Sequence, residues 1–241
     1  MPAPKYSIAE QEQLILDAAA QCILESSLID FKMSAIAKHA GLSMGSVYKH
    51  IQSKEDVLVA LSVRLEQRAA NVIEEVLALP FSLPTKIVAI NLVSQEAMYL
   101  YPFGYQLMTL LNSKDLLAKA SEKWLSKLNG VSNDIHHCFE GALKQAVIDN
   151  ELLCAADEEE ALIREFMLLQ WAINVGFPQI TNHHHDSYQI EEGTDASPAL
   201  PLDHPLIKAT VRMTNGYPWK APVSSAELTE IEKILQQRGM R

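Results

Sequence analysis

The sequence predicts an all-α protein with a small N-terminal head and a larger helical body. Through most of the chain, apolar residues recur every three to four positions, which is the spacing of one face of an α-helix. No stretch alternates apolar and polar residues as a half-buried strand does. Residues that begin or end helices, namely Ser, Gly and Pro, separate these segments. We therefore expect a three-helix, helix-turn-helix domain over residues 1–55 and a helical domain over residues 56–241.

Composition and the sequence of the N-terminus predict an intracellular protein. With 241 residues, 48% of them hydrophobic, the chain can form two unequal domains with buried cores. Its three cysteines are odd in number and lack metal-like spacing, so we expect reduced thiols. The N-terminus has no apolar signal core, and no apolar run is long enough to span a membrane. These features predict a cytoplasmic protein with no membrane contact.

The segment 32–54 predicts two short helices joined by a tight turn. Ile36 and Ala40 give the first helix an inward face, and Val47 and Ile51 do the same for the second. Gly41 ends the first helix, because glycine readily takes the left-handed conformation that closes a helix. The side chain of Ser43 can then accept from the free N–H groups that open the second helix. This is a helix-turn-helix arrangement.

The same segment is basic in an otherwise acidic chain. The net charge of the protein is -10, yet the segment contains Lys32, Lys38, Lys49 and Lys54 and no Asp or Glu. A basic helix-turn-helix is the electrostatic pattern expected of a surface that meets phosphates. A helical hairpin buried in another kind of domain is the alternative. It would not need so many polar side chains away from its apolar face.

The run GLSMGSVYKHIQSKEDVL resembles the recognition-helix segment of the tetracycline-repressor (TetR) family. The resemblance covers roughly residues 10 to 60 and implies a head that binds double-stranded DNA at a near-palindromic operator. Phe31 and Lys32 depart from the family, where a Thr or Ser usually caps the second helix. The resemblance implies DNA contacts, to base edges or to phosphates, by Lys32, Ser34, Ser43, Met44, Gly45, Ser46, Tyr48, Lys49, His50 and Lys54.

Helical spacing continues through the body. Ser53 begins a long connector helix that ends at Pro80, and further helices are expected over 85–101, 103–111 and 114–128. Asn129-Gly130 should end the last of these. The remaining segments expected to form helices are 132–150, 157–175, 203–215 and a final helix from Ser224, with a long loop over 178–205.

The helix expected over 157–175 is apolar on nearly all sides, so several surfaces must cover it. A second copy of the protein is the cover we expect, giving a homodimer through a four-helix interface with one of the C-terminal helices. The residues predicted to lie at this interface are Leu162, Phe166, Leu169, Trp171 and Ile173.

The resemblance also implies a small-molecule effector held among the middle helices of the body, with the protein acting as a repressor that the effector releases. An apolar or aromatic effector is expected, and the alternative is a body that binds a partner protein and has no effector. Aromatic side chains in these helices could line a pocket or simply fill a core. The candidate lining residues are Tyr99, Tyr101, Phe103, Tyr105, Met108, Trp124 and Phe139.

Catalytic and metal sites are not expected. The chain has no Gly-rich phosphate loop, no HExxH motif and no CxxC motif. Three consecutive histidines, His183 to His185, lie in the predicted loop, but neighbouring loop residues cannot easily turn to one ion and no second ligand pair accompanies them. We therefore predict a protein that is not an enzyme, with no cofactor and no metal.

Overall fold

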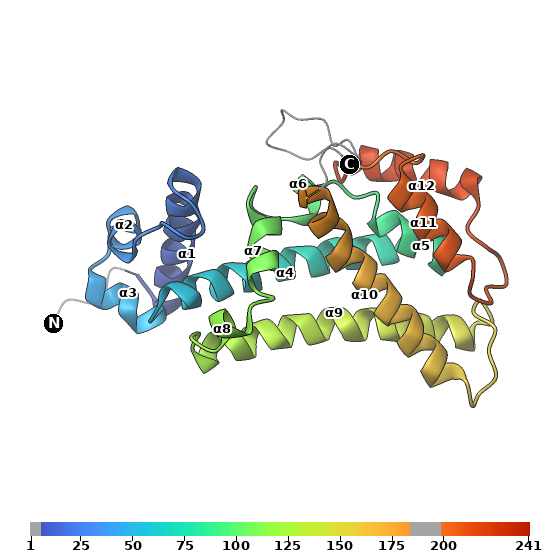
Figure 1. Ribbon diagram of the computed structural model, residues 1–241, viewed down its shortest axis with the longest axis horizontal. Helices are drawn as coiled ribbons and strands as arrows, with labels where there is room; N and C mark the ends of the chain where they lie inside the picture. Colours follow the sequence, from blue (N-terminus) through green and yellow to red (C-terminus); the bar gives the residue numbers. More distant parts are fainter. Residues whose placement is uncertain (1–5, 184–198) are drawn as a thin grey trace. The chain divides into compact units, whose positions relative to one another are not determined.

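A computed structural model describes residues 6–183 and 199–241, and these residues form an all-α structure (Figure 1). In the described ranges, extended pairing is limited to an isolated antiparallel bridge between Leu152 and Trp219. The prediction of an all-α fold is confirmed. In chain order, the helices are α1 (Ile8–Glu25), α2 (Met33–His39), α3 (Met44–His50), α4 (Lys54–Leu77), α5 (Leu83–Ile90), α6 (Gln95–Met98), α7 (Gly104–Leu110), α8 (Lys114–Leu117), α9 (Glu122–Ile148), α10 (Glu159–His183), α11 (Pro205–Thr214) and α12 (Ser225–Gln237).

Packing divides the chain into two compact units. The first, which we call the head unit, contains Met1–Gln67 and Phe103–Val131, and the second, the body unit, contains Arg68–Pro102 and Ser132–Arg241. This division differs from the expected boundary between residues 55 and 56. The difference arises because α7, α8 and the start of α9 pack with the N-terminal helices.

In the head unit, α1 begins at a capping box. Glu10 N–H donates to Ser7 Oγ at 3.2 Å, and Ser7 N–H donates to the Glu10 carboxylate at 2.7 Å. Ile15 and Ala19, on the inward face of α1, are fully buried. Cys22 Sγ lies 3.1 Å from His39 Nδ1, so α1 also contacts the end of α2 through a polar pair.

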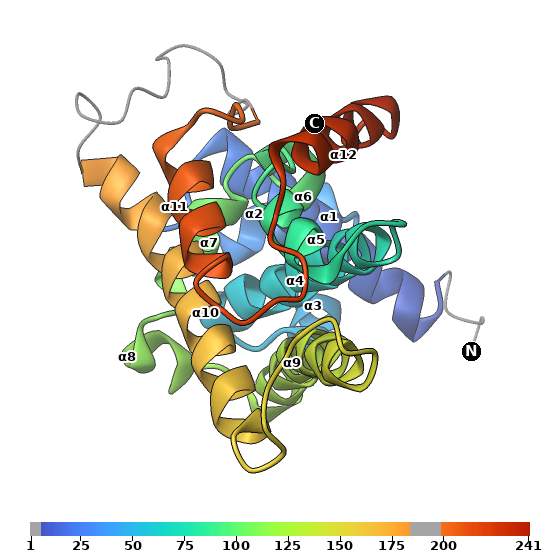
Figure 2. The same ribbon diagram turned by 90° about the vertical axis from the view of Figure 1, so that its right-hand side faces the viewer.

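The body unit has two apolar clusters. In the first, α5 packs beside α11 and α12 (Figure 2). Arg241 closes this cluster at the C-terminus, because its guanidinium donates to the carbonyl oxygens of Leu92 and Leu200 and pairs with Glu232 at 2.6 Å. The second cluster joins α5 to α9 and α10, and its buried members are Leu83, Ile87, Leu143, Ala146, Leu152, Ile163, Phe166 and Trp219.

Three predicted helix boundaries are wrong. The structure has one helix, α9, through Asn129-Gly130, because a mid-helix glycine costs only about 1 kcal/mol and tertiary packing overrides it. The helix expected over 85–101 is two helices, since Ser94 caps a new one by accepting from Ala97 N–H at 3.2 Å. The loop expected from residue 178 begins later, because α10 runs to His183. His184 and His185 lie outside the described residues.

Candidate nucleic-acid interface

The turn between α2 and α3 has the predicted geometry. Gly41 has a φ of 64°, in the left-handed region where glycine is favoured. Ser43 caps α3, and its Oγ accepts from Ser46 N–H at 3.1 Å. Gly41 to Gly45 also spell the GxSxG pattern of hydrolase nucleophile elbows. That pattern requires a strand before the serine, and α2 precedes it instead.

One side of α3 is exposed and carries most of the residues expected to contact DNA. Val47 is fully buried and holds the helix against the rest of the head unit. On the opposite side, Met44 and Tyr48 are 36% and 46% exposed. The structure also leaves these other predicted contact residues exposed: Lys32, Ser34, Ser43, Gly45 and Lys49. Ser46 is half-buried beneath them. A single surface therefore presents lysines, hydroxyls and an apolar thioether.

Lys54 is partly engaged inside the head unit. Its ammonium donates to the carbonyl oxygen of Ile29 at 2.9 Å and lies 4.8 Å from the centroid of the Phe31 ring. Phe31 itself is buried, and Lys32 begins α2 without a side-chain hydrogen bond to the helix. At the position where the family usually has a helix cap, this chain therefore has Phe31 as a core residue, with the Lys54 ammonium over its ring.

His50 does not lie on the exposed side of α3, although we expected it near phosphates. Its side chain is 7% exposed, and Nε2 lies 3.3 Å from Gln11 Oε1. Burial lowers the pKa of the His50 imidazole, with Lys123 and Lys49 acting in the same direction and Glu12 opposing them. The buried imidazole of His50 is therefore a core residue in this structure.

A polar cluster at the end of α3 was not predicted from the sequence. Glu12 on α1 pairs with Lys123 at 2.7 Å and with Lys127 at 2.8 Å. Both ammonium groups lie over the ring of Trp124, at 4.5 and 4.3 Å from its centroid. The spacing of Lys123 and Lys127 on one helix face could have indicated a paired site. Its carboxylate partner lies more than a hundred positions away in the chain, which no local pattern reveals.

The candidate ligand residues are divided between the two units. Trp124, Phe103, Tyr105 and Met108 belong to the head unit, whereas Tyr99, Tyr101 and Phe139 belong to the body unit. Trp124 is 1% exposed and its indole N–H donates to the carbonyl oxygen of His50 at 3.1 Å, so it is a core residue of the head unit. Burial raises the pKa of Tyr99, which keeps its hydroxyl neutral.

The predicted interface residues of α10 also separate into two groups. Phe166 is 2% exposed and stacks edge-on against Tyr217 and Trp219, and Leu162 packs beside it. These two residues fill the core of the body unit. Trp171 is 65% exposed, Leu169 is 39% exposed and Ile173 is half-buried. Leu168 and Val175, which were not in the predicted set, are exposed at 65% and 39%.

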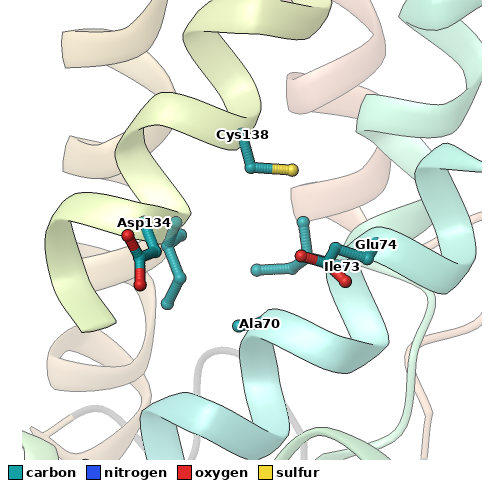
Figure 3. Close-up of a pocket in the computed structure, with 6 residues that line it drawn as sticks. Ala70, Ile73, Glu74, Asp134 and Cys138 are labelled. Atoms are coloured by element: carbon teal, nitrogen blue, oxygen red, sulfur yellow. The ribbon is translucent and has the colours of Figure 1, made fainter. Parts of the chain in front are cut away.

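A small pocket lies between α4 and α9 in the body unit (Figure 3). Its volume of about 20 Å³ is on the scale of a single water molecule. The lining combines apolar and acidic groups with one thiol: Ala70, Ile73, Glu74, Asp134, Ile135 and Cys138. Burial and the nearby Glu74 raise the pKa of the Cys138 thiol, so the neutral form is favoured.

The described residues contain neither a metal-binding cluster nor a membrane-spanning helix. Across residues 6–183 and 199–241, no three His, Cys, Asp or Glu side chains converge where a metal ion could be held. In the same part of the chain, every helix is too short or too polar to cross a membrane.

Comparison with known proteins matches the head. Residues 15–61 fit the sequence model described as bacterial regulatory proteins, tetR family. The fatty acid metabolism regulator protein of Bacillus subtilis (strain 168) is 40% identical over 58 residues, which are 24% of this chain and 27% of that protein. The chain therefore spans about a quarter of the length of this curated relative.

Solved structures match over most of the chain, but at low identity. Salmonella enterica GusR is 17% identical with a TM-score of 0.55, and the alignment covers 86% of this chain and 95% of that one. The reduced form of E. coli NemR is 15% identical with a TM-score of 0.54, covering 88% and 99%. At such identities the likeness is one of fold. The likeness to a family in sequence is carried by residues 15–61, where the head of this chain is similar to the TetR family of bacterial regulatory proteins.

Proposed function

We propose that the protein is a transcriptional regulator that binds double-stranded DNA at a near-palindromic operator as a homodimer. The exposed side of α3 carries this proposal, because it presents Lys49, Met44 and Tyr48 together on a helix that Val47 holds from below. Lysines contact phosphates, while a thioether can contact thymine methyl groups in the major groove. The hydroxyl of Tyr48 can reach the phosphate backbone of the DNA. The protein then reads bases partly by apolar contact.

The exposed face of α10 supports assembly with a second copy. Trp171 and Leu168 are each 65% exposed. Large apolar side chains that lie close together are rarely left this exposed to solvent. The sequence from Phe166 to His183 contains no charged residue. Interface cores are depleted of charge and enriched in tryptophan. A two-fold pairing of α10 places the same residues of both copies in contact and supplies two heads for two half-sites.

We further propose that the protein is a repressor that a small apolar or aromatic effector releases. Tyr99 and Tyr101 of the body unit support this, since their rings could form an apolar wall with hydroxyl groups at the tips. The Bacillus subtilis relative is a regulator of fatty acid metabolism, which suggests acyl compounds as the first class to test. An effector acts only by binding the DNA-competent and released states unequally.

A partner protein is the second candidate for control of the body. The pocket between α4 and α9 is far smaller than the roughly 300 Å³ that small-molecule sites require. The exposed residues Leu168 and Trp171 would then meet the partner in place of a second copy. Sedimentation of the purified protein separates these cases, because a monomer at micromolar concentration removes the homodimer.

Selection of DNA by the purified protein tests the central proposal. Random duplexes are passed over the protein at about 0.15 M salt, and the bound fraction is sequenced through several rounds. We expect enrichment of an inverted repeat, with half-sites about one helical turn apart. A Lys49→Ala, Tyr48→Ala variant is the matched control, and it should enrich nothing. If the wild-type protein retains duplexes without any shared motif, specific operator binding is wrong. Acyl compounds that raise the thermal stability and leave operator affinity unchanged would refute the effector.

A further inference from the structure

The start of α9 holds the end of the recognition helix α3. His50 is the last residue of α3, and its carbonyl oxygen has no acceptor role left inside the helix. Trp124 donates to that oxygen from its indole N–H at 3.1 Å, and Lys123 Nζ lies 3.4 Å from it. The C-terminal end of α3 is thus closed by side chains of α9.

Asp56 makes a second connection between the same two segments. Its side chain is fully buried. One carboxylate oxygen accepts from Gln52 N–H at 2.8 Å, just after α3, and the other accepts from Ser121 N–H at 2.6 Å, just before α9. A buried carboxylate is stable only when its oxygens are hydrogen-bonded, so displacing either segment leaves an unpaired charge in the interior.

Glu12 fixes the position of the start of α9 against α1. It pairs with Lys123 and Lys127, whose ammonium groups also lie over the ring of Trp124. The indole is therefore held at its edge by a hydrogen bond to α3 and on its ring by two cations. We call Ser121, Lys123, Trp124 and Lys127, with their partners Glu12 and Asp56, the α9 clamp.

We propose that the α9 clamp sets the orientation of the recognition helix, with Trp124 as its positioning residue. The proposal rests on the proposed function, because α3 is taken to read DNA. Residues 122–131 of α9 belong to the head unit, and the helix continues without a break to Ile148. Any event in the body that moves α9 along its axis must stretch the hydrogen bonds that Trp124 donates to the His50 carbonyl and that Ser121 N–H donates to Asp56.

Two tryptophans of this chain form a matched pair for the test. Trp124 and Trp219 are both buried, and each indole N–H donates to the carbonyl of the last residue of a helix, His50 of α3 or Thr214 of α11. Trp124→Phe and Trp219→Phe therefore remove the same kind of bond, the second from the body unit. Affinity is measured for the selected operator and for random duplex DNA. We expect Trp124→Phe to lower the ratio of the two affinities by about three- to tenfold. Trp219→Phe should leave the ratio within twofold.

A general loss of stability would lower both affinities together and keep their ratio, so an unchanged ratio for Trp124→Phe overturns the proposal. Equal losses of the ratio in both variants also overturn it. Should Trp124→Phe not fold, Lys123→Met and Lys144→Met replace the pair. Each removes one positive charge from α9 and breaks one Lys–Glu pair, to Glu12 and to Glu140 respectively. The loss of specificity is then expected only for Lys123→Met.

Hydrogen exchange separates failure of the clamp from failure of the proposed function. Amides of residues 44–52 should exchange several-fold faster in Trp124→Phe than in the wild-type protein, with no DNA present. If the wild-type protein selects no DNA sequence, the proposed function fails, and this exchange rate decides the clamp alone. Unchanged exchange in residues 44–52 would show that Trp124 does not hold α3.

Discussion

Substituting Gly41 by alanine isolates the contribution of the helix-turn-helix turn. A Cβ added at Gly41 meets no atom within 4 Å, so steric clash contributes nothing. The whole effect comes from the backbone, because φ at this position is 64°. A non-glycine residue in the left-handed region costs about 1–2 kcal/mol. Alanine also restricts the unfolded chain, which offsets about 0.5 kcal/mol of that cost. We therefore expect Gly41→Ala to lower the free energy of unfolding by about 1 kcal/mol.

Gly130 provides the control, since it lies in the same unit and its added Cβ also meets nothing within 4 Å. It is an exposed position inside α9, where alanine is favoured over glycine by about 0.5–1 kcal/mol. The same added methyl group should therefore destabilise at one position and stabilise at the other. In thermal unfolding followed by circular dichroism, a change of 1 kcal/mol shifts the midpoint by about 4–8 °C for a domain of 60–100 residues. A Gly41→Ala midpoint at or above that of the wild-type protein would refute the left-handed turn.

Three further predictions concern charge, assembly and pH. Lys54→Ala should weaken binding to all DNA sequences and reduce the slope of log affinity against log salt by about one per head, whereas loss of the preferred site alone would contradict a phosphate contact. Leu169→Glu should give a folded monomer in sedimentation. The control is Leu153→Glu, which changes a 47% exposed leucine outside α10 and should leave the protein dimeric. If both variants are dimeric, the interface lies elsewhere. Because the pKa of His50 is lowered in the folded protein, the unfolded chain binds more protons below about pH 6.5. The free energy of unfolding should therefore fall as pH decreases from 6.5 through the pKa of His50 in the folded protein. His50→Gln should remove only part of that fall. The rest comes from His204, because burial lowers its pKa too and it changes stability in the same direction.

Local chemistry allowed much of the head to be predicted. The cap of α3 by Ser43 and the left-handed Gly41 depend on residues three or four positions apart, which a sequence displays directly. The start of α4 follows the same rule, since Asp56 N–H donates to Ser53 Oγ at 3.0 Å. Gly130 was misjudged by that rule. Its preference against helix is small compared with the packing of a long helix on both sides of it.

Residues whose partners are distant in the sequence could not be assigned. Trp124 was expected in a ligand pocket. The sequence around an aromatic residue on an amphipathic helix does not show whether its ring will line a pocket or pack in a core. Its partner carbonyl belongs to His50, 74 positions earlier. Phe166 was expected at the dimer interface for a similar reason. Helical periodicity shows that α10 is apolar on several sides, but only the packed structure shows that Phe166 faces Tyr217 while Trp171 faces outward.

The placement of carboxylates explains how an acidic protein can present a DNA-binding surface. In the head unit, Glu12 is paired with Lys123 and Lys127, Asp17 is paired with Arg64 at 2.7 Å, and buried Asp56 is bonded to backbone N–H groups. By contrast, in the described part of the chain no ion pair joins Lys32, Lys38 or Lys49 to a carboxylate.

This difference matters because the affinity for DNA comes largely from release of the ions that screen phosphates. A lysine already held by a carboxylate would have to give up that partner before meeting a phosphate, and the gain would be small. Lys32, Lys38 and Lys49 have no such competitor among the described residues, so each that meets a phosphate should add about 0.9 to the salt slope per head. A dimer doubles that number. The positive surface of α2 and α3 is therefore preserved in a chain of charge -10 by pairing the nearby acidic groups elsewhere.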